Sequence, residues 1–234
     1  MTRKFSIVVL TLNEEANLPK CLTSAASCDD VLVVDSGSTD RTVEIAKNMG
    51  ARVIENRFEN FAQQRNFANQ EGGLRYTWVF HLDADETLSP QLFQECSEAE
   101  LGDELDGAWV APRMMWRGHW LKRCTDYPAW QARFVQRLRF RFIEVGHGQR
   151  EAPEMRMTKF QTGYNHDMSS GGAADWLAKH RRYAEAEAAA YLATPRPPVE
   201  QLWSSDHLAR RRALKYFSYG MPCRPLLRFF YQYL

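Results

Sequence analysis

Hydrophobic runs alternate with polar, helix-like segments over the first ninety residues. The runs are continuous and rich in β-branched residues, which is the pattern of strands covered on both faces. Helices are predicted between them, and strands that alternate with helices at this spacing indicate right-handed βαβ units in a mainly parallel sheet. The predicted strands are residues 5–12, 31–34, 51–55 and 76–82, and the predicted helices run from Pro19 to about residue 27, up to Gly50, and over residues 61–70 before Gly72.

The periodicity is less regular beyond Pro90. Residues 107–115 and 130–137 have strand composition, with a loop of aromatic and basic residues, 116–128, between them. Residues 175–192 are rich in Ala, Glu and Lys, which predicts a helix, and the proline-rich segment 195–198 then forms a stiff connector. We therefore expect an α/β domain over residues 1–170 and a helical C-terminal extension over residues 171–234.

Aspartates follow two of the predicted strands. Asp35 and Asp83 stand at carboxyl ends of strands, and in parallel sheets these ends border the ligand crevice. Asp83 and Asp85 are two positions apart in extended backbone, so both side chains can face one cation. Carboxylate oxygens are the ligands that Mg²⁺ prefers. The sequence therefore predicts a divalent metal site at Asp83 and Asp85, with a solvated acidic turn as the alternative.

Other polar residues near this edge have two interpretations each. The Asp35 carboxylate could hydrogen-bond a ribose or a base, while Thr39 or Asp40 could cap the helix that follows. Arg65 could reach a diphosphate as a fork-shaped donor or be an ordinary solvated arginine on a helix. His81 lies within a predicted strand, which favours a hydrogen-bonded core residue over a metal ligand.

Composition and charge narrow the class of protein. The 234 residues carry a net charge of +1 and 44% hydrophobic residues, which indicates a globular chain and argues against nucleic acid as a partner. Five cysteines without a C-x-x-C pair are typical of reduced thiols. The sequence has neither a signal-peptide pattern nor a spanning hydrophobic stretch. We therefore expect a chain that faces the cytoplasm.

The C-terminal segment, residues 199–234, combines six Lys/Arg and eight aromatic residues with two Asp/Glu. Aromatic rings and basic side chains suit the headgroup region of an anionic membrane. We expect a peripheral contact with the inner face of the cell membrane, and packing of this segment on its own domain is the alternative.

Several motifs together resemble glycosyltransferase family 2. They are S-I-V-V-L-T-L-N-E-E at 6–15, V-V-D-S-G-S-T-D at 33–40, Q-R-N at 64–66 and H-L-D-A-D-E at 81–86. Three later segments resemble the lipopolysaccharide core β-glucosyltransferase branch of that family. These are G-H-W-L-K at 118–122, Y-P-A-W-Q at 127–131 and K-H-R-R-Y at 179–183.

The resemblance implies a GT-A fold, with a nucleotide half over about residues 1–90 and an acceptor half over about 91–170. It also implies a UDP-sugar donor, a Mg²⁺ or Mn²⁺ ion, transfer of a hexose with inversion, and a lipid-linked, lipopolysaccharide or exopolysaccharide acceptor. The residues that would contact the nucleotide-sugar are Thr11, Asn13, Glu14, Asp35, Arg65 and Asp83.

Inversion by direct displacement requires a general base for the acceptor hydroxyl. Relatives often have a His-Glu pair where this chain reads G-H-G-Q-R-E at 146–151, and an acid where it has Ala129. Glu151 is the first candidate for the base and Asp126 the second, and His147 would orient the base or bind the acceptor. Trp116, Trp120 and Trp130 are candidates for a sugar-stacking wall, with buried packing as the alternative.

Two other functions remain open. A sugar nucleotidyltransferase shares the sheet and the metal but needs a glycine-rich, basic loop near the first strand, where this chain has Asn13-Glu14-Glu15. A catalytically degenerate, membrane-docked scaffold is the other, because the general base is uncertain.

Overall fold

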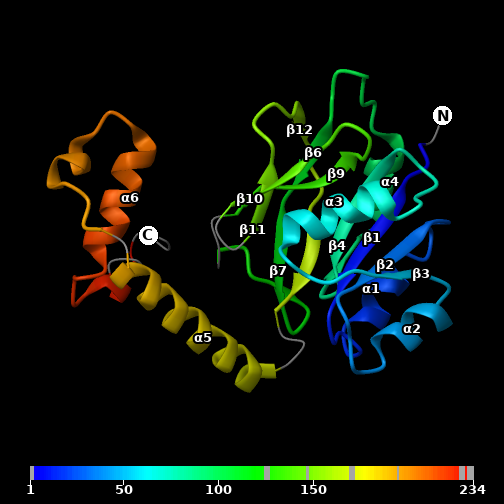
Figure 1. Ribbon diagram of the computed structural model, residues 1–234, viewed down its shortest axis with the longest axis horizontal. Helices are drawn as coiled ribbons and strands as arrows, with labels where there is room; N and C mark the ends of the chain where they lie inside the picture. The colour runs from blue at the N-terminus through cyan, green and yellow to red at the C-terminus, as the bar shows by residue number, and fades with distance from the viewer. Residues whose placement is uncertain are drawn as a thin grey trace. The chain divides into compact units, whose positions relative to one another are not determined.

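The computed structural model describes residues 3–123, 127–145, 148–168, 172–193, 195–226 and 230. By their internal contacts the residues divide into two compact units, Met1–Ser170 and Gly171–Leu234. The first unit holds all the sheets of the described chain, and the second is helical (Figure 1).

A mixed sheet forms the centre of the first unit, and the described part of the chain gives it seven strands in the order β12-β6-β9-β4-β1-β2-β3. Strands β4, β1, β2 and β3 are parallel, whereas β9 is antiparallel to both of its neighbours. The predicted mainly parallel α/β architecture is therefore confirmed. The strands are β1 (Ser6–Thr11), β2 (Val31–Asp35), β3 (Arg52–Glu55), β4 (Trp78–Asp83), β6 (Gly107–Val110), β9 (Gln131–Gln136) and β12 (Met157–Lys159).

Both faces of this sheet are covered, which explains the continuous hydrophobic runs in the sequence. Ile7 and Val9 of β1 pack in one buried cluster with residues of helices α1 (Leu18–Ser24) and α4 (Pro90–Glu98). Val8 and Leu10 point to the other face and pack in a second cluster with residues of α3 (Phe61–Glu71). Alternate residues of one strand thus belong to two different cores.

The ends of α2 and α3 follow the predicted glycine signals, whereas α1 ends at Ser24, before the predicted end near residue 27. Helix α2 (Thr42–Asn48) is followed by its C-cap Met49 and then by Gly50, which has a φ of 83°. The amide of Gly50 donates to the Lys47 carbonyl at 3.0 Å, and the amide of Ala51 donates to the Ala46 carbonyl at 3.0 Å. This is a Schellman motif, which needs a residue with positive φ at the position of Gly50. Helix α3 stops at Gly72, as predicted.

The predicted strand 107–115 is two strands in two different sheets, so that prediction was wrong. β6 ends at Val110, and β7 begins at Pro112 on a second sheet with the order β5-β13-β7-β8. The hydrophobic run is continuous because both strands have buried residues, so the pattern alone did not show the change of sheet. The second sheet contains β5 (Glu86–Thr87), β13 (Tyr164–Asp167), β7 (Pro112–Trp116) and β8 (His119–Trp120), and a separate hairpin contains β10 (Phe142–Val145) and β11 (Gly148–Glu151).

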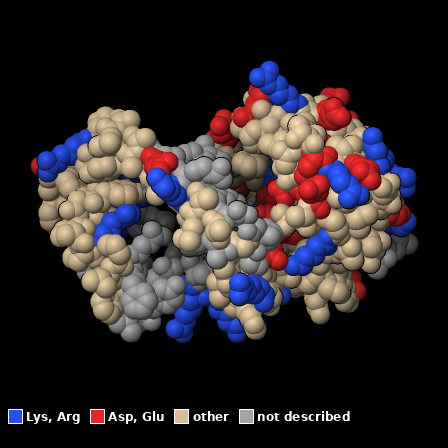
Figure 2. All heavy atoms as spheres, turned by 90° about the horizontal axis from the view of Figure 1, so that it is seen from below, with Lys and Arg blue, Asp and Glu red and all other residues tan. Residues whose placement is uncertain are grey.

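The surface carries both signs of charge. Lys/Arg and Asp/Glu side chains appear side by side on the face seen in Figure 2, in keeping with a net charge of +1.

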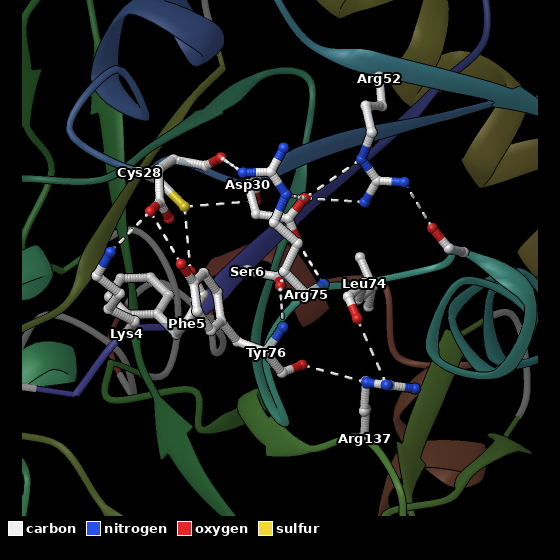
Figure 3. Close-up of polar contacts among 12 residues, drawn as sticks. Lys4, Phe5, Ser6, Cys28, Asp30, Arg52, Leu74, Arg75, Tyr76 and Arg137 are labelled. Atoms are coloured by element: carbon white, nitrogen blue, oxygen red, sulfur yellow. Dashed lines mark hydrogen bonds and ion pairs between the residues drawn. The ribbon is translucent and has the colours of Figure 1, made fainter.

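A buried carboxylate forms hydrogen bonds at the amino ends of several strands of the central sheet. Asp30 accepts hydrogen bonds from Ser6 Oγ at 2.6 Å, from the Arg75 amide at 2.8 Å and from Arg52 Nη2 at 2.9 Å. Figure 3 shows these three residues converging on Asp30. Because this cluster lies at the amino ends of the strands, it is at the opposite edge of the sheet from Asp35 and Asp83.

The second unit consists of α5 (Gly172–Ala193), a short 3₁₀ segment (Val199–Trp203) and α6 (His207–Ser218). The rings of Tyr216 and Tyr219 pack on the ring of Tyr191, with centroid distances of 4.7 and 4.9 Å. Among the described residues no helix combines the length and the hydropathy that crossing a membrane requires.

Candidate active site

The site is built on Asp83, the last residue of β4, which lies at the carboxyl edge of the central sheet. Its Oδ1 lies 2.6 Å from Nη2 of Arg65, and its Oδ2 lies 3.1 Å from Nη2 of Arg133. Arg65 comes from α3 and has no exposed surface, so the interpretation as a solvated helix arginine was wrong. The Nε and Nη1 atoms of Arg65 have no hydrogen-bond partner within the described part of the chain.

Arg133 connects the charged residues of the site. It projects from β9, the antiparallel strand beside β4, and its Nη2 lies 2.8 Å from Oε1 of Glu86. Its guanidinium carbon lies 4.9 Å from the ring centre of Tyr164. Glu86 in turn accepts a hydrogen bond from the amide of Asp83 at 2.8 Å. The turn after β4 is therefore held by its own Glu86 and by Arg133 of β9.

Three side chains around this turn have the geometry of a metal site. Oδ2 of Asp85 lies 3.4 Å from Nε2 of His166, and Oε1 of Glu86 lies 3.5 Å from Nδ1 of the same ring. Candidate ligand atoms of the three residues all lie within 4.8 Å of one another. The two carboxylates offer the oxygen ligands that Mg²⁺ and Mn²⁺ prefer, and the imidazole adds a nitrogen donor of the kind that binds transition metals. Strand pairing creates this group, since β13 places His166 directly opposite Glu86.

The two predicted metal ligands, Asp83 and Asp85, have different surroundings in the structure. Asp85 belongs to the group with Glu86 and His166, whereas both carboxylate oxygens of Asp83 face the two arginines. The assignment of Asp83 as a metal ligand stays a prediction.

Burial and charge shift the pKa values of these groups in opposite directions. Burial by itself would raise the pKa of the Asp83 carboxyl, but the charges of Arg65 and Arg133 outweigh it and hold that pKa below its ordinary value. For Glu86, burial outweighs Arg133 and raises the pKa. For His166, burial would lower the pKa, but Glu86 and Asp85 raise it.

The Asp35 carboxylate organises the loop after β2. Its Oδ1 accepts hydrogen bonds from Thr11 Oγ1 at 2.8 Å and from Ser38 Oγ at 2.6 Å. Its Oδ2 accepts from the amides of Gly37 at 3.0 Å and Ser38 at 2.7 Å. The carboxylate is 1% exposed and shapes the loop in this structure. A contact of Asp35 or Thr11 with a nucleotide stays a prediction.

The loop after β1 is joined to the loop after β2. Asn13 has a φ of 55°, and its Oδ1 accepts a hydrogen bond from the amide of Thr39 at 2.8 Å. The amide of Glu14 donates to Thr42 Oγ1 at 2.7 Å. Asp40 contacts the first turn of α2, because the amide of Thr42 donates to its Oδ1 at 2.9 Å. The predicted nucleotide residues Asn13 and Glu14 thus lie at the same carboxyl edge as Asp35.

The three candidate ligands Asp85, Glu86 and His166 are called the acidic group below. A pocket of about 160 Å³ opens beside its member Asp85. Asp85, Thr87 and Asp167 line one part of it, and residues at the start of α1 line the other. Lys20 of α1 forms an ion pair of 2.7 Å with Asp167 across this pocket. The pocket gives solvent and small ligands access to Asp85.

The predicted general bases are not among these residues. Glu151 is the last residue of β11 and pairs with Phe142, in the hairpin that is separate from both larger sheets. Phe142 packs against His81 with a centroid distance of 5.2 Å. His81 is buried and bonded to Asn69 at 3.0 Å, as expected for a core histidine. Asp126 and His147 lie outside the described residues.

Sequence reasoning missed Glu86, His166 and Arg133 as site residues. Glu86 directly follows Asp85 in the motif. The sequence argument selected only Asp83 and Asp85, because side chains two positions apart in extended backbone point the same way. His166 and Arg133 are far from Asp85 in the sequence. The antiparallel pairing of β13 with β5 brings His166 near Asp85, and the antiparallel pairing of β9 with β4 brings Arg133 near it.

Comparison with known proteins identifies the family. Residues 6–147 match the model of glycosyl transferase family 2. The match covers more than half of the chain, and the chain belongs to this family. Its fold is the GT-A fold that the resemblance implied.

Relatives agree with this assignment. An uncharacterized glycosyltransferase of Rickettsia bellii is 38% identical over 96 residues, which cover 41% of this chain and 32% of the relative. The lipopolysaccharide core biosynthesis glycosyltransferase LpsC of Rhizobium meliloti is 34% identical over 114 residues, or 46% of this chain and 42% of LpsC. The matched segments span about a third to less than half of these relatives. The resemblance to family 2 and to lipopolysaccharide core enzymes is confirmed.

Solved structures give more distant matches. Staphylococcus aureus TarS 1–349 in complex with UDP-GlcNAc has a TM-score of 0.47 and 18% identity, over 70% of this chain and 58% of that chain. Mycobacterium tuberculosis glucosyl-3-phosphoglycerate synthase in complex with Mn²⁺, UDP and glucosyl-3-phosphoglycerate has a TM-score of 0.38 and 23% identity, over 50% of this chain and 45% of that chain.

Proposed function

We propose that the chain is an inverting hexosyltransferase, which moves a hexose from a UDP-sugar to a lipid-linked, lipopolysaccharide or exopolysaccharide acceptor. The observation that carries the proposal is the grouping of Asp85, Glu86 and His166 beside two buried arginines at the carboxyl edge of the sheet. Family membership supports glycosyl transfer, and the LpsC relative supports a lipopolysaccharide-type acceptor.

The charges of the site favour a divalent cation followed by a diphosphate. Three carboxylates, Asp83, Asp85 and Glu86, lie with two arginines, so the ionised site has a formal charge of −3 + 2 = −1 while His166 is neutral. A divalent cation would bring this to +1, and that sign attracts an anion. Arg65 Nε and Nη1 are buried and have no hydrogen-bond partner among the described residues, so they leave positive charge beside the site that only Asp83 offsets directly.

Asp85, Glu86 and His166 would hold Mg²⁺ or Mn²⁺, and the ion would neutralise the charge that builds up on the departing diphosphate. The residues of the chain have separate tasks in this scheme. Arg65 and Arg133 fix Asp83 and Glu86, and the loops that carry Asn13 and Asp35 form the edge where the nucleotide would bind.

In the reaction, an oxygen of the acceptor hydroxyl forms a bond to C1 of the hexose as the bond from C1 to the diphosphate oxygen breaks. The hydroxyl proton passes to a general base on the acceptor side, and UDP leaves with the bonding electron pair. Attack from the face opposite UDP inverts C1. Glu151 and Asp126 remain the proposed bases.

Donor binding can be tested by titrating the chain with UDP in the presence and absence of Mn²⁺, using calorimetry. UDP affinity should rise at least tenfold with Mn²⁺, and Asp85→Asn should remove that increase. A chain whose UDP affinity is the same with and without Mn²⁺ would contradict the metal assignment. Product analysis by NMR with UDP-hexoses would then report the configuration at C1.

Two alternative functions predict other outcomes. A sugar nucleotidyltransferase would release pyrophosphate from UTP and a sugar phosphate, and the acidic Asn13-Glu14-Glu15 segment disfavours a triphosphate at that position. A degenerate scaffold would bind UDP without turnover on any acceptor, and loss of measured transfer in Glu151→Gln or Asp126→Asn would exclude it.

We also propose that the second unit contacts an anionic membrane at its cytoplasmic face. Trp203 is 77% exposed, and Arg210, Arg212 and Lys215 of α6 are exposed near it in the sequence. An interfacial tryptophan and clustered cations favour anionic headgroups. Flotation with phosphatidylglycerol vesicles should recover the chain, whereas phosphatidylcholine vesicles should not. Equal recovery with both lipids, or unchanged recovery of Trp203→Ala/Arg210→Ala, would contradict this contact.

A further inference from the structure

The hairpin of β7 and β8 presents two neighbouring side chains at its tip. Its turn residues, Arg117 and Gly118, have φ values of 49° and 81°, as a two-residue type I′ turn requires. The turn places Trp116 directly opposite His119, and Met115 directly opposite Trp120. Paired residues point to the same face of a sheet, so Trp116 and His119 share one face and Trp120 lies on the other.

The face that carries Trp116 is also the face of Glu86 and His166. His166 pairs with Glu86 on one side and with Met114 of β7 on the other. Trp116 is two residues beyond Met114, so it points in the same direction. Strand spacing and rise place its Cα about 8 Å from that of His166. A sugar ring lying on the Trp116 indole would therefore be on the same face as Glu86 and His166 and near a donor held there.

The other two tryptophans lie elsewhere. The ring of Trp120 is 5.3 Å from the Arg113 guanidinium and 5.2 Å from the Lys122 ammonium, on the opposite face of the hairpin. Trp130 lies before β9, with the Lys159 ammonium 5.1 Å from its ring. The three rings therefore do not form one wall. Among them, Trp116 is the tryptophan that faces the same side as Glu86 and His166.

The chemistry of the tip suits a pyranose. Trp116 is half-buried and His119 is exposed. The C–H face of a pyranose packs on an aromatic ring, and an imidazole can donate or accept a hydrogen bond at a neighbouring hydroxyl. The two side chains together offer an apolar platform with one polar contact beside it.

We propose that Trp116 and His119 form the subsite for the acceptor sugar, with Trp116 stacking on the ring and His119 bonding a hydroxyl. The assignment rests on the proposed transferase function and adds a substrate class to it: an acceptor that presents the apolar face of a pyranose next to the hydroxyl that reacts. Trp116 and His119 determine acceptor affinity, and the donor binds independently of them.

Saturation-transfer NMR on the full chain with UDP and diamagnetic Mg²⁺ tests the subsite, using methyl β-D-glucopyranoside, methyl α-D-mannopyranoside and methyl β-D-galactopyranoside as probes. The wild-type chain should bind at least one of the three through ring protons. Trp116→Leu should weaken that binding at least tenfold, His119→Ala should weaken it severalfold, and Trp116→Phe should retain part of it.

Trp130→Leu is the matched control and should bind the probe as the wild-type chain does. Thermal unfolding and UDP titration of every variant separate a folding defect or loss of the donor site from loss of the subsite. Failure of the wild-type chain to bind UDP would contradict the transferase function itself. Intact UDP binding with no probe binding in the wild-type chain, or with equal probe binding in Trp116→Leu, would overturn the subsite.

Discussion

Nη2 of Arg133 lies 2.8 Å from Oε1 of Glu86, and both side chains are almost fully buried, with 3% and 1% of their surfaces exposed. The same Nη2 atom lies 3.1 Å from Oδ2 of Asp83. One guanidinium therefore holds two carboxylates on either side of Asp85. Arg133 therefore contacts both ends of the D-A-D-E segment, residues 83–86.

Arg133→Met should damage both stability and metal binding. Removing one partner of a buried ion pair costs about 3–5 kcal/mol, because the remaining charge is left without compensation. Glu86 would then bind a proton more readily, and a protonated carboxyl is a poor ligand. We expect a lower midpoint in urea unfolding and at least a tenfold loss of Mn²⁺ affinity by calorimetry.

Arg137→Met is the control for that variant. Arg137 follows β9 and donates to the carbonyls of Tyr76 and Asn69 instead of to a carboxylate. It should lose stability but keep wild-type Mn²⁺ affinity. An Arg133→Met chain that binds Mn²⁺ like the Arg137→Met chain would show that Arg133 has only a structural role.

Asp83→Asn and Asp85→Asn should have different effects. Asp85 lies in the group of candidate ligands, and its neutral amide should reduce Mn²⁺ affinity at least tenfold with a small change in stability. Asp83 faces two buried arginines, so its amide should cost about 2–4 kcal/mol of unfolding free energy. Urea unfolding and Mn²⁺ titration of both variants measure the two quantities. Equal loss of Mn²⁺ affinity in both would support the original pair of aspartate ligands.

Metal affinity should increase with pH. The pKa of His166 is raised above its ordinary value of 6.5, because Glu86 and Asp85 outweigh the effect of burial. A protonated imidazole cannot bind a cation, so Mn²⁺ affinity should fall by up to about tenfold per pH unit as the pH drops through that raised pKa. Titrations from pH 9 to pH 6 measure this. His166→Ala should bind Mn²⁺ more weakly, with a flatter pH profile, and a slope identical to wild type would rule out this histidine.

Asp30→Ala should destabilise the fold without affecting the donor site. Its carboxylate accepts bonds from Ser6, Arg52 and Arg75 at the far edge of the sheet, and its loss should cost about 3 kcal/mol. Burial would raise the pKa of Asp30, but these hydrogen bonds outweigh it and lower the pKa. The stabilisation is therefore complete above the ordinary pKa and is lost as the pH falls through the lowered one.

Urea unfolding from pH 7 to pH 2 checks this prediction. The difference between wild type and Asp30→Ala should be largest near neutral pH and should shrink below about pH 4. UDP titration should give the same affinity for both chains, and a clear loss in the variant would contradict a purely structural role.

The elements of the first ninety residues could be predicted because each strand is a continuous hydrophobic run between turn residues. Gly50 and Gly72 mark helix ends in the sequence and in the structure. The later strands are short and belong to three different sheets, so β6 and β7 formed one run in the sequence. Periodicity gives the type of an element but does not specify which strand it pairs with.

The residues of the candidate site were likewise only partly predictable from the sequence. Asp35, Asp83 and Asp85 could be found because the carboxyl ends of parallel strands share one edge. Arg133 and His166 could not, since their approach depends on antiparallel pairings between distant segments. Both carboxylate oxygens of Asp83 face arginines in the structure, and its role as a metal ligand stays a prediction.

The pairing of β5 with β13 also bears on how such a chain can be divided or recombined. The family match ends at residue 147, whereas His166, the third member of the acidic group, lies nineteen positions later and in another strand. A graft limited to the matched segment would transplant Asp85 and Glu86 without their imidazole neighbour and would leave β5 without the strand it pairs with. A segment that carries the whole site must therefore extend through Asp167, the last residue of β13.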